Sequence, residues 1–505
     1  MLNIRNAGKI QTIFADFFPA EFLTQSYLFS FRPIQRTGRV PMSTSGQRNR
    51  ALSGKLFTLF LGVVFLLAPA KGLARKNVLF PVYPVIEVNV QFWQDVYGRY
   101  STRQGILHDK DNLAIVYGII DLVDWNTPGA ARINKNLIKL ARHRYKKVLN
   151  DLGRGRKPRT REEKRIASLF PPEKHTRYLK ARDNIRLQIG QKDRFLQGVV
   201  RSGAYLPDLQ AIFAAHNMPV ELAYLPHVES SFNPKAHSKA GAVGLWQFTR
   251  GTGRNFMTIN SVLDERYDPF LSSQAAAKLL KKNYSQLGSW PLALTAYNYG
   301  RAGMVRALRA QKSYENIFKN HKTRIFKFAS RNFYSEFVAA LRVARKLEKD
   351  RSIIRDRPAA TLSIRMEGYA DAGEIRRYFK LSGKDFARFN PALRDPVLSG
   401  KKYIPKGYLL RLPATKLIRQ RAGKMGTRFY HSRQIRDHKY TVRKGDTIGS
   451  IGRRFGVSTR ELIRVNNLNR KATIRIGQKL VLPKGKTTKS SKRIPILKDR
   501  AKRKP

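Results

Sequence analysis

The segment 221–248, which reads ELAYLPHVESSFNPKAHSKAGAVGLWQF, constrains this chain more than any other segment. Pro219 is typical of a helix start, and Asn233-Pro234 is typical of a helix end. The sequence therefore predicts a helix that breaks just after Glu229 and passes into a loop rich in Ser, Asn and Gly. The alternative is a surface carboxylate at a helix C-terminus, where the helix dipole disfavours negative charge.

Three motifs follow one another along the chain: ESSFNP at 229–234, SKAGAVGLWQF at 238–248 and AYNYG at 296–300. In this order and spacing they resemble the lysozyme-like catalytic domain of the soluble lytic transglycosylases. Several independent motifs agree, whereas a lone Glu-Ser pair would indicate little. The resemblance implies a multidomain, mainly α chain with a helical lysozyme-like catalytic domain at 204–350.

The resemblance also implies that one carboxylate, Glu229, is the catalytic group of a carbon–oxygen lyase acting on polysaccharide. In the family, cleavage leaves a 1,6-anhydromuramic end and no water enters the product. One carboxyl group can do this if it donates its proton to the glycosidic oxygen and then accepts one from the sugar's own 6-hydroxyl. A second catalytic carboxylate is then not required. The apolar wall that keeps Glu229 protonated is expected from Leu225, Phe232, Leu245, Trp246 and Phe248.

Four further polar residues match family positions that contact the substrate. Ser238 and Gln247 match positions that hold the N-acetyl group, whose oxygen stabilises the cationic sugar carbon in place of a second carboxylate. Tyr297 and Asn298 match the third motif, in which Tyr lines the sugar cleft and Asn braces the loop. The alternatives are that Ser238 and Gln247 are ordinary loop residues and that Tyr297 is a core residue.

One position departs from the family pattern. The family carries a Tyr aimed at the catalytic Glu near the domain end, but strict register places Phe333 there, with Tyr334 beside it. Successive helix residues point about 100° apart, so Tyr334 can take the role only if the helix phase is shifted or the approach differs. We include Tyr334 among the expected substrate-binding residues.

The C-terminal segment 439–483 has the pattern of a small βααβ module, and it resembles the lysin motif (LysM) over its whole length. Ser458 and Glu461 are spaced as a capping box for the second helix. The resemblance implies that loops at 445–448 and 474–478 bind glycans that contain N-acetylglucosamine. The residues expected to bind are Gly445, Asp446, Thr447, Ile476 and Gly477.

An internal repeat precedes this module. The spacing from Phe379 to Asn390 equals that from Phe455 to Asn466, and each copy closes with a Gly six residues before a Pro. The first copy, 362–413, lacks the Gly-Asp-Thr start, so it is interpreted as a degenerate LysM-like module that keeps the fold without the sugar grip. Residues 414–438 are predicted to form a flexible linker to the LysM module.

The charge balance demands an anionic partner. The chain holds 99 Lys and Arg against 34 Asp and Glu, a formal net charge of +65. Nucleic acid is one reading, but the basic residues are spread over all segments and are not gathered in one recognition element. The expected partners are peptidoglycan glycan strands and an anionic envelope surface, without specific nucleic-acid binding.

Residues 42–74 resemble a signal peptide, and residues 1–41 are interpreted as a misassigned start. The apolar run 56–68 falls within the range of about 7–15 residues for a signal sequence and is short of the roughly 20 needed to span a membrane. We therefore expect export to the periplasm or cell envelope. An uncleaved signal anchor is the one membrane attachment considered, because without cysteine there is no site for a lipid anchor, a disulfide or a thiolate-bound metal.

The remaining segments are less informative. Residues 80–203 are predicted to be a helical lead-in with a strand-like stretch at 115–123, and 484–505 a basic disordered tail. The His residues show no metal-ligand spacing, and no metal or cofactor is expected. The alternatives to a lytic transglycosylase are a hydrolytic muramidase on the same fold, a non-catalytic peptidoglycan-binding scaffold, and a nucleic-acid-binding protein.

Overall fold

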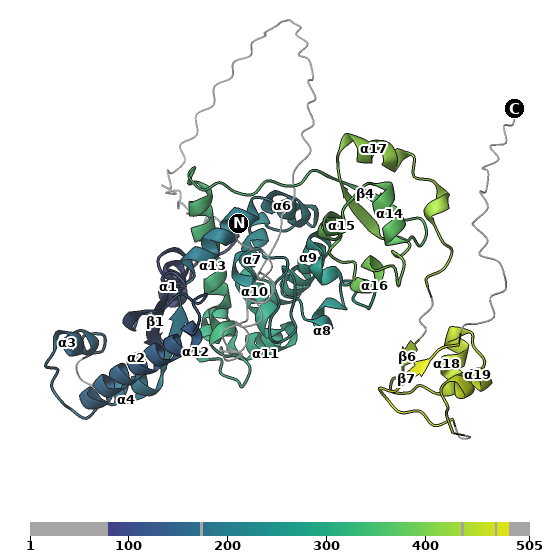
Figure 1. Cartoon of the computed structure of the whole chain (residues 1–505). Coiled ribbons are helices and arrows are strands. Elements are labelled where there is room, and N and C mark those ends of the chain that lie inside the picture. Colours follow the sequence, from purple (N-terminus) through teal and green to yellow (C-terminus); the bar gives the residue numbers. More distant parts are fainter. Residues whose placement is uncertain (1–78, 172–174, 436–438, 470–471, 484–505) are drawn as a thin grey trace, which may run out of the picture.

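The computed structural model describes residues 79–171, 175–435, 439–469 and 472–483 (Figure 1). The predicted leader at 42–74, the residues 1–41 and the basic tail 484–505 lie outside the described residues. Within the described ranges helices dominate, and the strands form three small antiparallel sheets. The prediction of a mainly α chain with small β-containing modules is confirmed. No helix in these ranges combines the length and the apolarity that a membrane crossing requires.

The region that contains the three motifs, which is the expected catalytic region, is a helical bundle around the largest buried apolar cluster of the described residues, which runs from Ile86 to Ala344. Its long C-terminal helix, α13, contacts helices from both ends of the region. The elements are η4 (Pro84–Ile86), α1 (Glu87–Gly98), α5 (Lys192–Ser202), α6 (Leu206–Ala215), η5 (Val220–Tyr224), α7 (Leu225–Glu229), α8 (Arg250–Gly253), η6 (Glu265–Tyr267), α9 (Pro269–Leu287), α10 (Trp290–Tyr299), α11 (Arg301–Gln311), α12 (Tyr314–Asn320) and α13 (Phe328–Glu348).

The bundle begins well before the predicted boundary at residue 204. The buried residues Ile86, Val90, Trp93 and Tyr97 recur at helical spacing, so α1 presents one apolar face. That face packs against α13. Helix α1 is therefore an integral part of the catalytic bundle, although it is separated from the catalytic motifs in sequence.

Residues between α1 and α5 contain a sheet, which corrects the prediction of a helical lead-in. Three antiparallel strands lie in the order β2-β1-β3, and the strand-like stretch at 115–123 contains β2. Helix α2 packs against β2 and β3, and its Tyr145 and Leu149 belong to a separate buried cluster. The elements are β1 (Gln104–Asp109), β2 (Val116–Asp121), α2 (Ala130–Gly153), α3 (Arg161–Ala167), α4 (His175–Asp183) and β3 (Ile185–Ile189).

The first LysM-like module has the βααβ arrangement that the internal repeat predicts. Strands β4 and β5 pair antiparallel, and Asp371 and Ser382 cap the two helices that follow β4. A short additional helix, α16, occupies the insertion relative to the second copy. The elements are β4 (Thr361–Arg365), α14 (Ala372–Tyr378), α15 (Gly383–Phe389), α16 (Asp395–Leu398) and β5 (Leu409–Pro413).

Residues 414–435 are folded onto this module, which corrects the prediction of a flexible linker. Helix α17 (Lys416–Gly423) and the 3-10 turn η7 (Thr427–Phe429) follow β5 directly. Ile418, Phe429 and Tyr430 are buried in the same apolar cluster as the module's own helices. The segment looks like a linker in the sequence because its apolar residues are interspersed with basic residues and follow no single period.

The first module is joined to the catalytic region through a continuous set of contacts. The Arg411 guanidinium bonds both carboxylate oxygens of Asp268, at 3.2 and 3.3 Å, and lies over the ring of Phe270. Leu263 packs into the module's apolar cluster. The backbone of Asp264 donates to the carbonyl of Ala392 at 2.9 Å. The module is therefore an extension of the catalytic body.

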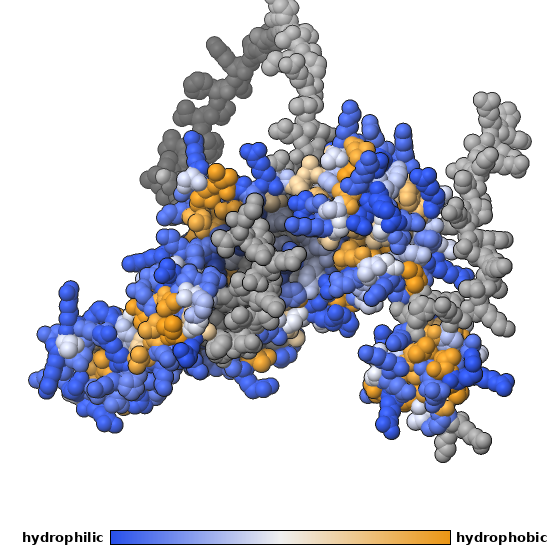
Figure 2. Space-filling view, viewed as in Figure 1, coloured by the Kyte–Doolittle hydropathy of each residue, from blue (hydrophilic) through white to orange (hydrophobic). Residues whose placement is uncertain are grey.

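The second module has the βααβ order predicted for a LysM. Its buried side chains, among them Tyr440, Ile451 and Leu480, form a cluster of their own. Thr447 caps the first helix in a capping box with Ser450. Figure 2 shows mostly hydrophilic residues over the visible face of the described chain, with apolar side chains gathered on this module. The elements are β6 (Lys439–Thr441), α18 (Ile448–Phe455), α19 (Thr459–Val465) and β7 (Lys479–Val481).

Candidate active site

Glu229 is the last residue of α7, where the sequence predicts the helix break. Its side chain is buried, with 5% of the residue exposed. The chain turns immediately after it, because Ser231 and Phe232 have left-handed backbone conformations with φ of 37° and 69°. The Arg201 guanidinium donates to the Ser231 carbonyl and holds this turn against α5. The motif thus directs a carboxyl group inward at the end of a short helix.

The surroundings of Glu229 favour its protonated form. Burial raises its pKa well above the ordinary value of 4.5, and the negative charge of Glu336 raises it further. Glu336 lies on α13 and is itself 2% exposed. The residues expected to form the apolar wall are all buried in the same core cluster; they are Leu225, Phe232, Leu245, Trp246 and Phe248. A carboxyl group in this setting can act as a proton donor near neutral pH.

Two tyrosines share the electrostatic environment of Glu229. Tyr297 of α10 donates its hydroxyl hydrogen to the Trp246 carbonyl at 2.7 Å. Burial raises the pKa of Tyr297, and the charge of Glu229 adds to the effect. The pKa of Tyr97 on α1 is also raised. Burial is the largest cause, followed by the charges of Glu336 and Glu229. Both hydroxyls therefore stay protonated, and α1 contributes a group that lies outside every motif.

Gln247 and Ser238 lie on the loop after Glu229, and both use their polar atoms to shape it. The Gln247 amide donates to the carbonyls of Gly244 and Ala236, at 2.8 and 3.4 Å, with the backbone in a left-handed conformation. The Ser238 hydroxyl accepts from the backbone of Ala242 at 3.0 Å. Both side chains are half-buried. The structure places them on the loop that the motif predicts.

Arg266 holds the same loop from the inside. Its guanidinium donates to the carbonyls of Gly241 and Phe248, each at 3.1 Å, and pairs with both oxygens of Asp264. Arg266 and Asp264 are 4% and 3% exposed. Gly244 approaches so closely that a Cβ there would lie 1.9 Å from the Arg266 carbonyl oxygen. Neither Arg266 nor Asp264 belongs to a motif, so sequence analysis misses this support.

Asn298 connects the third motif to α13. Its side-chain carbonyl accepts a hydrogen bond from the Ser330 hydroxyl at 2.7 Å. The end of α10, which carries Tyr297, is thereby tied to the helix that carries Glu336. The expectation that Asn298 braces the motif agrees with this contact.

Tyr334 is not part of the site, and its assignment as a substrate-binding residue is wrong. The residue is fully buried, and its hydroxyl donates to the Pro81 carbonyl at 2.9 Å. The neighbouring Phe333 takes the inward direction and stacks on Tyr297 with 6.4 Å between the ring centres. Adjacent helix residues point about 100° apart, so α13 can turn only one of the two toward α10.

Five residues of the second module are expected to bind glycan. Four of them shape the two loops, and the fifth is an exposed apolar side chain. The Asp446 carboxylate accepts hydrogen bonds from the Tyr440 hydroxyl and the Arg443 backbone, and Thr447 caps α18. Gly445 and Gly477 adopt positive φ values of 87° and 86° and turn the loops. Ile476 is 71% exposed, so it presents an apolar side chain to solvent on these loops.

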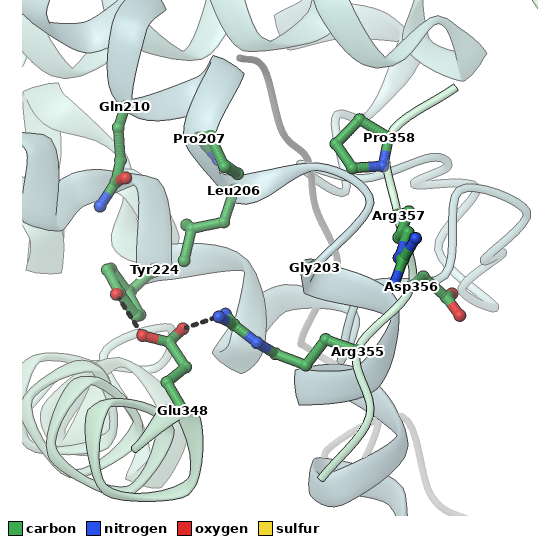
Figure 3. A pocket seen from close by; sticks show the side chains of 10 residues that line it. All are labelled: Gly203, Leu206, Pro207, Gln210, Tyr224, Glu348, Arg355, Asp356, Arg357 and Pro358. Carbon is green, nitrogen blue, oxygen red and sulfur yellow. Dashed lines mark hydrogen bonds and ion pairs between the residues drawn. The ribbon is translucent and has the colours of Figure 1, made fainter. Parts of the chain in front are cut away.

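A cavity of about 430 Å³ lies at a different place, between the end of α13 and the segment that follows it (Figure 3). Its polar groups face one another, since the Tyr224 hydroxyl donates to Glu348 at 2.8 Å and Arg355 lies 3.8 Å from the same carboxylate. Glu229 is not among its lining residues. Across the described ranges, no group of three metal-ligating side chains is found.

Comparisons with known proteins match two segments of this chain to protein families. The profile of the transglycosylase SLT domain matches residues 210–319, which include Glu229 and the third motif. The profile of the LysM domain matches residues 440–483. Over 329 residues, 60% of this chain and 72% of the relative, the chain is 27% identical to membrane-bound lytic murein transglycosylase D of Escherichia coli strain K12. The same values hold for the protein of that name from Escherichia coli O6:H1.

Proposed function

The chain carries the SLT catalytic domain and the LysM domain of the lytic transglycosylase family, and from this premise we propose its reaction. It is an exported peptidoglycan lytic transglycosylase that cleaves the β-1,4 bond between N-acetylmuramic acid and N-acetylglucosamine. The product carries a 1,6-anhydromuramic end. The observation that supports this most is the buried Glu229 within the matched domain, with a pKa raised by burial and by Glu336.

In the first half of the reaction, Glu229 donates its proton to the glycosidic oxygen as the bond to the muramic C1 breaks. A protonated donor is needed at this moment, and the environment of Glu229 supplies one near neutral pH. The positive charge that develops at C1 is shielded by the oxygen of the sugar's own N-acetyl group. Gln247 and Ser238 are the residues proposed to orient that group, since they shape the adjoining loop.

In the second half, the 6-hydroxyl oxygen of the same sugar bonds to C1 and its proton passes to the Glu229 carboxylate. The enzyme thus returns to its protonated state without consuming water. The two tyrosine hydroxyls of Tyr97 and Tyr297 remain protonated beside this carboxylate. A hydrolytic muramidase would differ only here, because water would replace the 6-hydroxyl and leave a reducing end.

Clearing of purified sacculi separates an enzyme from a binding scaffold. The full chain is expected to lower the turbidity of a sacculus suspension and to release soluble muropeptides. A scaffold that only binds peptidoglycan would sediment with the sacculi and leave the turbidity unchanged. That result would refute catalysis while leaving wall binding intact.

We expect Glu336→Gln to move the alkaline limb of the kcat–pH profile to lower pH. The reaction needs protonated Glu229, so the rate falls as pH rises through the pKa of Glu229. Removing the charge of Glu336 lowers that pKa, while burial still holds it above 4.5. Glu348→Gln is the matched control, because Glu348 lies on the same helix but bonds Tyr224. An unmoved limb in Glu336→Gln would refute the electrostatic role of Glu336.

The second module is proposed to retain the enzyme on glycan strands through its loops. Replacing Ile476 with Asp is expected to weaken sacculus retention by about tenfold or more, since it puts a charge at an apolar contact worth roughly 1.5–3 kcal/mol. Val481→Asp is the control, because Val481 is also exposed but lies on strand β7. Co-sedimentation titrations of the full chain give the affinities, and equal losses in both variants would contradict a loop-specific contact.

A further inference from the structure

The two copies of the repeat share their internal hydrogen bonds as well as their spacing. In the first copy, Asn390 exchanges side-chain hydrogen bonds with the backbone of Arg411, on the closing strand. In the second, Asn466 does the same with Val481. The bonds that flank the loops also correspond: Met366 to Tyr408 and Gly407 to Met366 in the first copy, Val442 to Gln478 and Gly477 to Val442 in the second. The loops at 367–371 and 404–408 are therefore equivalent to those at 443–447 and 474–478.

In the first module, the segment 430–435 lies against the loop after β4. His431 and Tyr369 exchange both backbone hydrogen bonds, at 2.6 and 3.1 Å. The approach is close, because a Cβ at Gly368 would lie 2.7 Å from the Cβ of Tyr430. These contacts add a short strand-like pairing to a loop that would otherwise face outward.

The same segment also contacts Lys402 and Tyr403, which directly precede the loop 404–408. The ring of His431 stacks on that of Tyr403, with 4.2 Å between centres and 1° between planes. The Gln434 side chain accepts from the backbone N–H of Tyr403 at 2.6 Å and donates to its carbonyl at 2.9 Å. Lys402 donates to the Ile435 carbonyl. One segment of chain therefore contacts the loop 367–371 and the two residues that precede the loop 404–408.

The equivalent position on the second module has a different character. Ile476, which is 71% exposed, corresponds to Lys406 in the first module. The first module thus carries a charged residue at the position where the second offers an apolar one. Lys406 itself is exposed, and the contacts from the module's own chain lie beside it, on Tyr369 and Tyr403.

We propose that residues 430–435 are a permanent intramolecular ligand of the first module, and that they cover the loop 367–371, which is equivalent to the first glycan-binding loop of the second module. This inference rests on the proposed role of the second module's loops. A tethered segment competes at an effective concentration in the millimolar range, so a free glycan cannot readily displace it. With Arg411 paired to Asp268, the first module serves as a fixed support of the catalytic body and not as a second wall-binding module.

Hydrogen exchange of the full chain, with and without an N-acetylglucosamine hexamer, tests the proposal. The hexamer is expected to slow exchange at 443–448 and 474–478 and to leave 367–371 and 401–408 unchanged. Slower exchange at 367–371 and 401–408 in the presence of the hexamer would overturn the proposal. Unchanged exchange at 443–448 and 474–478 would instead count against the glycan-binding role of the second module.

A variant pair tests the occlusion without any glycan. His431→Ala combined with Gln434→Ala is expected to raise exchange at 367–371 and 401–408 on the order of tenfold, since local opening then breaks fewer contacts. Arg433→Ala is the matched control in the same segment, because Arg433 is exposed. Protection in α13 and α9 reports whether the variant remains folded, and Gln434→Ala alone, with a smaller rise, serves if the double variant does not. Unchanged exchange in a folded variant would refute the occlusion.

Discussion

Glu229→Gln is expected to lower kcat on sacculi by about 10²–10⁴-fold, because an amide cannot donate the proton that general acid catalysis requires. The folded structure should tolerate the change, since burial raises the pKa of Glu229 and favours an uncharged side chain at this position. Release of soluble muropeptides, followed over time, gives the rates. Activity within about tenfold of the wild type would contradict the role of Glu229.

Glu221→Gln is the control for this substitution, because Glu221 belongs to the preceding turn η5 and pairs with Arg345 near the surface.

The free energy of unfolding of Glu229→Gln tests the raised pKa of Glu229 independently of activity. A carboxyl whose pKa is raised in the folded state destabilises the fold as pH rises above 4.5, the value in the unfolded chain. The variant should therefore match the wild type near pH 4 and exceed it in free energy of unfolding at neutral pH.

Arg266→Ala is expected to destabilise the fold by about 3–5 kcal/mol, because it leaves the buried Asp264 carboxylate without its partner. Two carbonyls of the loop that carries Gln247 lose their donor as well, so the remaining folded enzyme should turn over more slowly. Denaturant unfolding measures the first effect, and sacculus digestion at a temperature where the variant is folded measures the second.

Arg144→Ala is the control for Arg266→Ala. It shows how much the loss of an exposed ion pair lowers the free energy of unfolding. Arg144 pairs with Glu162 at the surface, with 65% and 26% of the two side chains exposed. An exposed pair contributes about 0–1 kcal/mol, so this variant should unfold almost like the wild type. If Arg266→Ala and Arg144→Ala lose a comparable free energy of unfolding, the Arg266 pair does not support the loop that carries Gln247.

The motifs were sufficient to predict that Glu229 lies at a helix end and that the apolar residues near it in sequence are buried. Helix start and stop signals are local, and the break after Glu229 depends on residues within a few positions of it. The LysM pattern is local in the same sense, because strand, caps and helices follow one another over a short stretch. The second module therefore has the predicted element order.

The partners of Glu229 could not be predicted because they come from distant segments. Tyr97 and Glu336 lie on α1 and α13, and only the packing of these two helices brings them to the end of α7. Arg266 supports the loop that carries Gln247 from η6, where the sequence offers no recognised pattern. Local sequence patterns cannot predict such contacts between distant segments.

Two of the wrong predictions, Tyr334 and the flexible linker, have identifiable physical reasons. The choice of Tyr334 over Phe333 depends on the rotation of α13, and that rotation is set by packing against Tyr314 and Tyr297. The segment 414–435 was misread because its order comes from contacts with the preceding module, through Ile418 and Phe429. The composition of a segment indicates how it behaves in isolation. Here the neighbouring module orders the segment by packing against it.

Digestion of sacculi in ¹⁸O-labelled water, followed by mass spectrometry of the released muropeptides, tests the central claim most directly. If Glu229 passes the proton between the glycosidic oxygen and the 6-hydroxyl, the wild type releases anhydromuramic ends that carry no label, and Glu229→Gln releases almost none. Labelled reducing ends from the wild type would show that water is the nucleophile and would contradict the proposed single-carboxylate transglycosylase reaction.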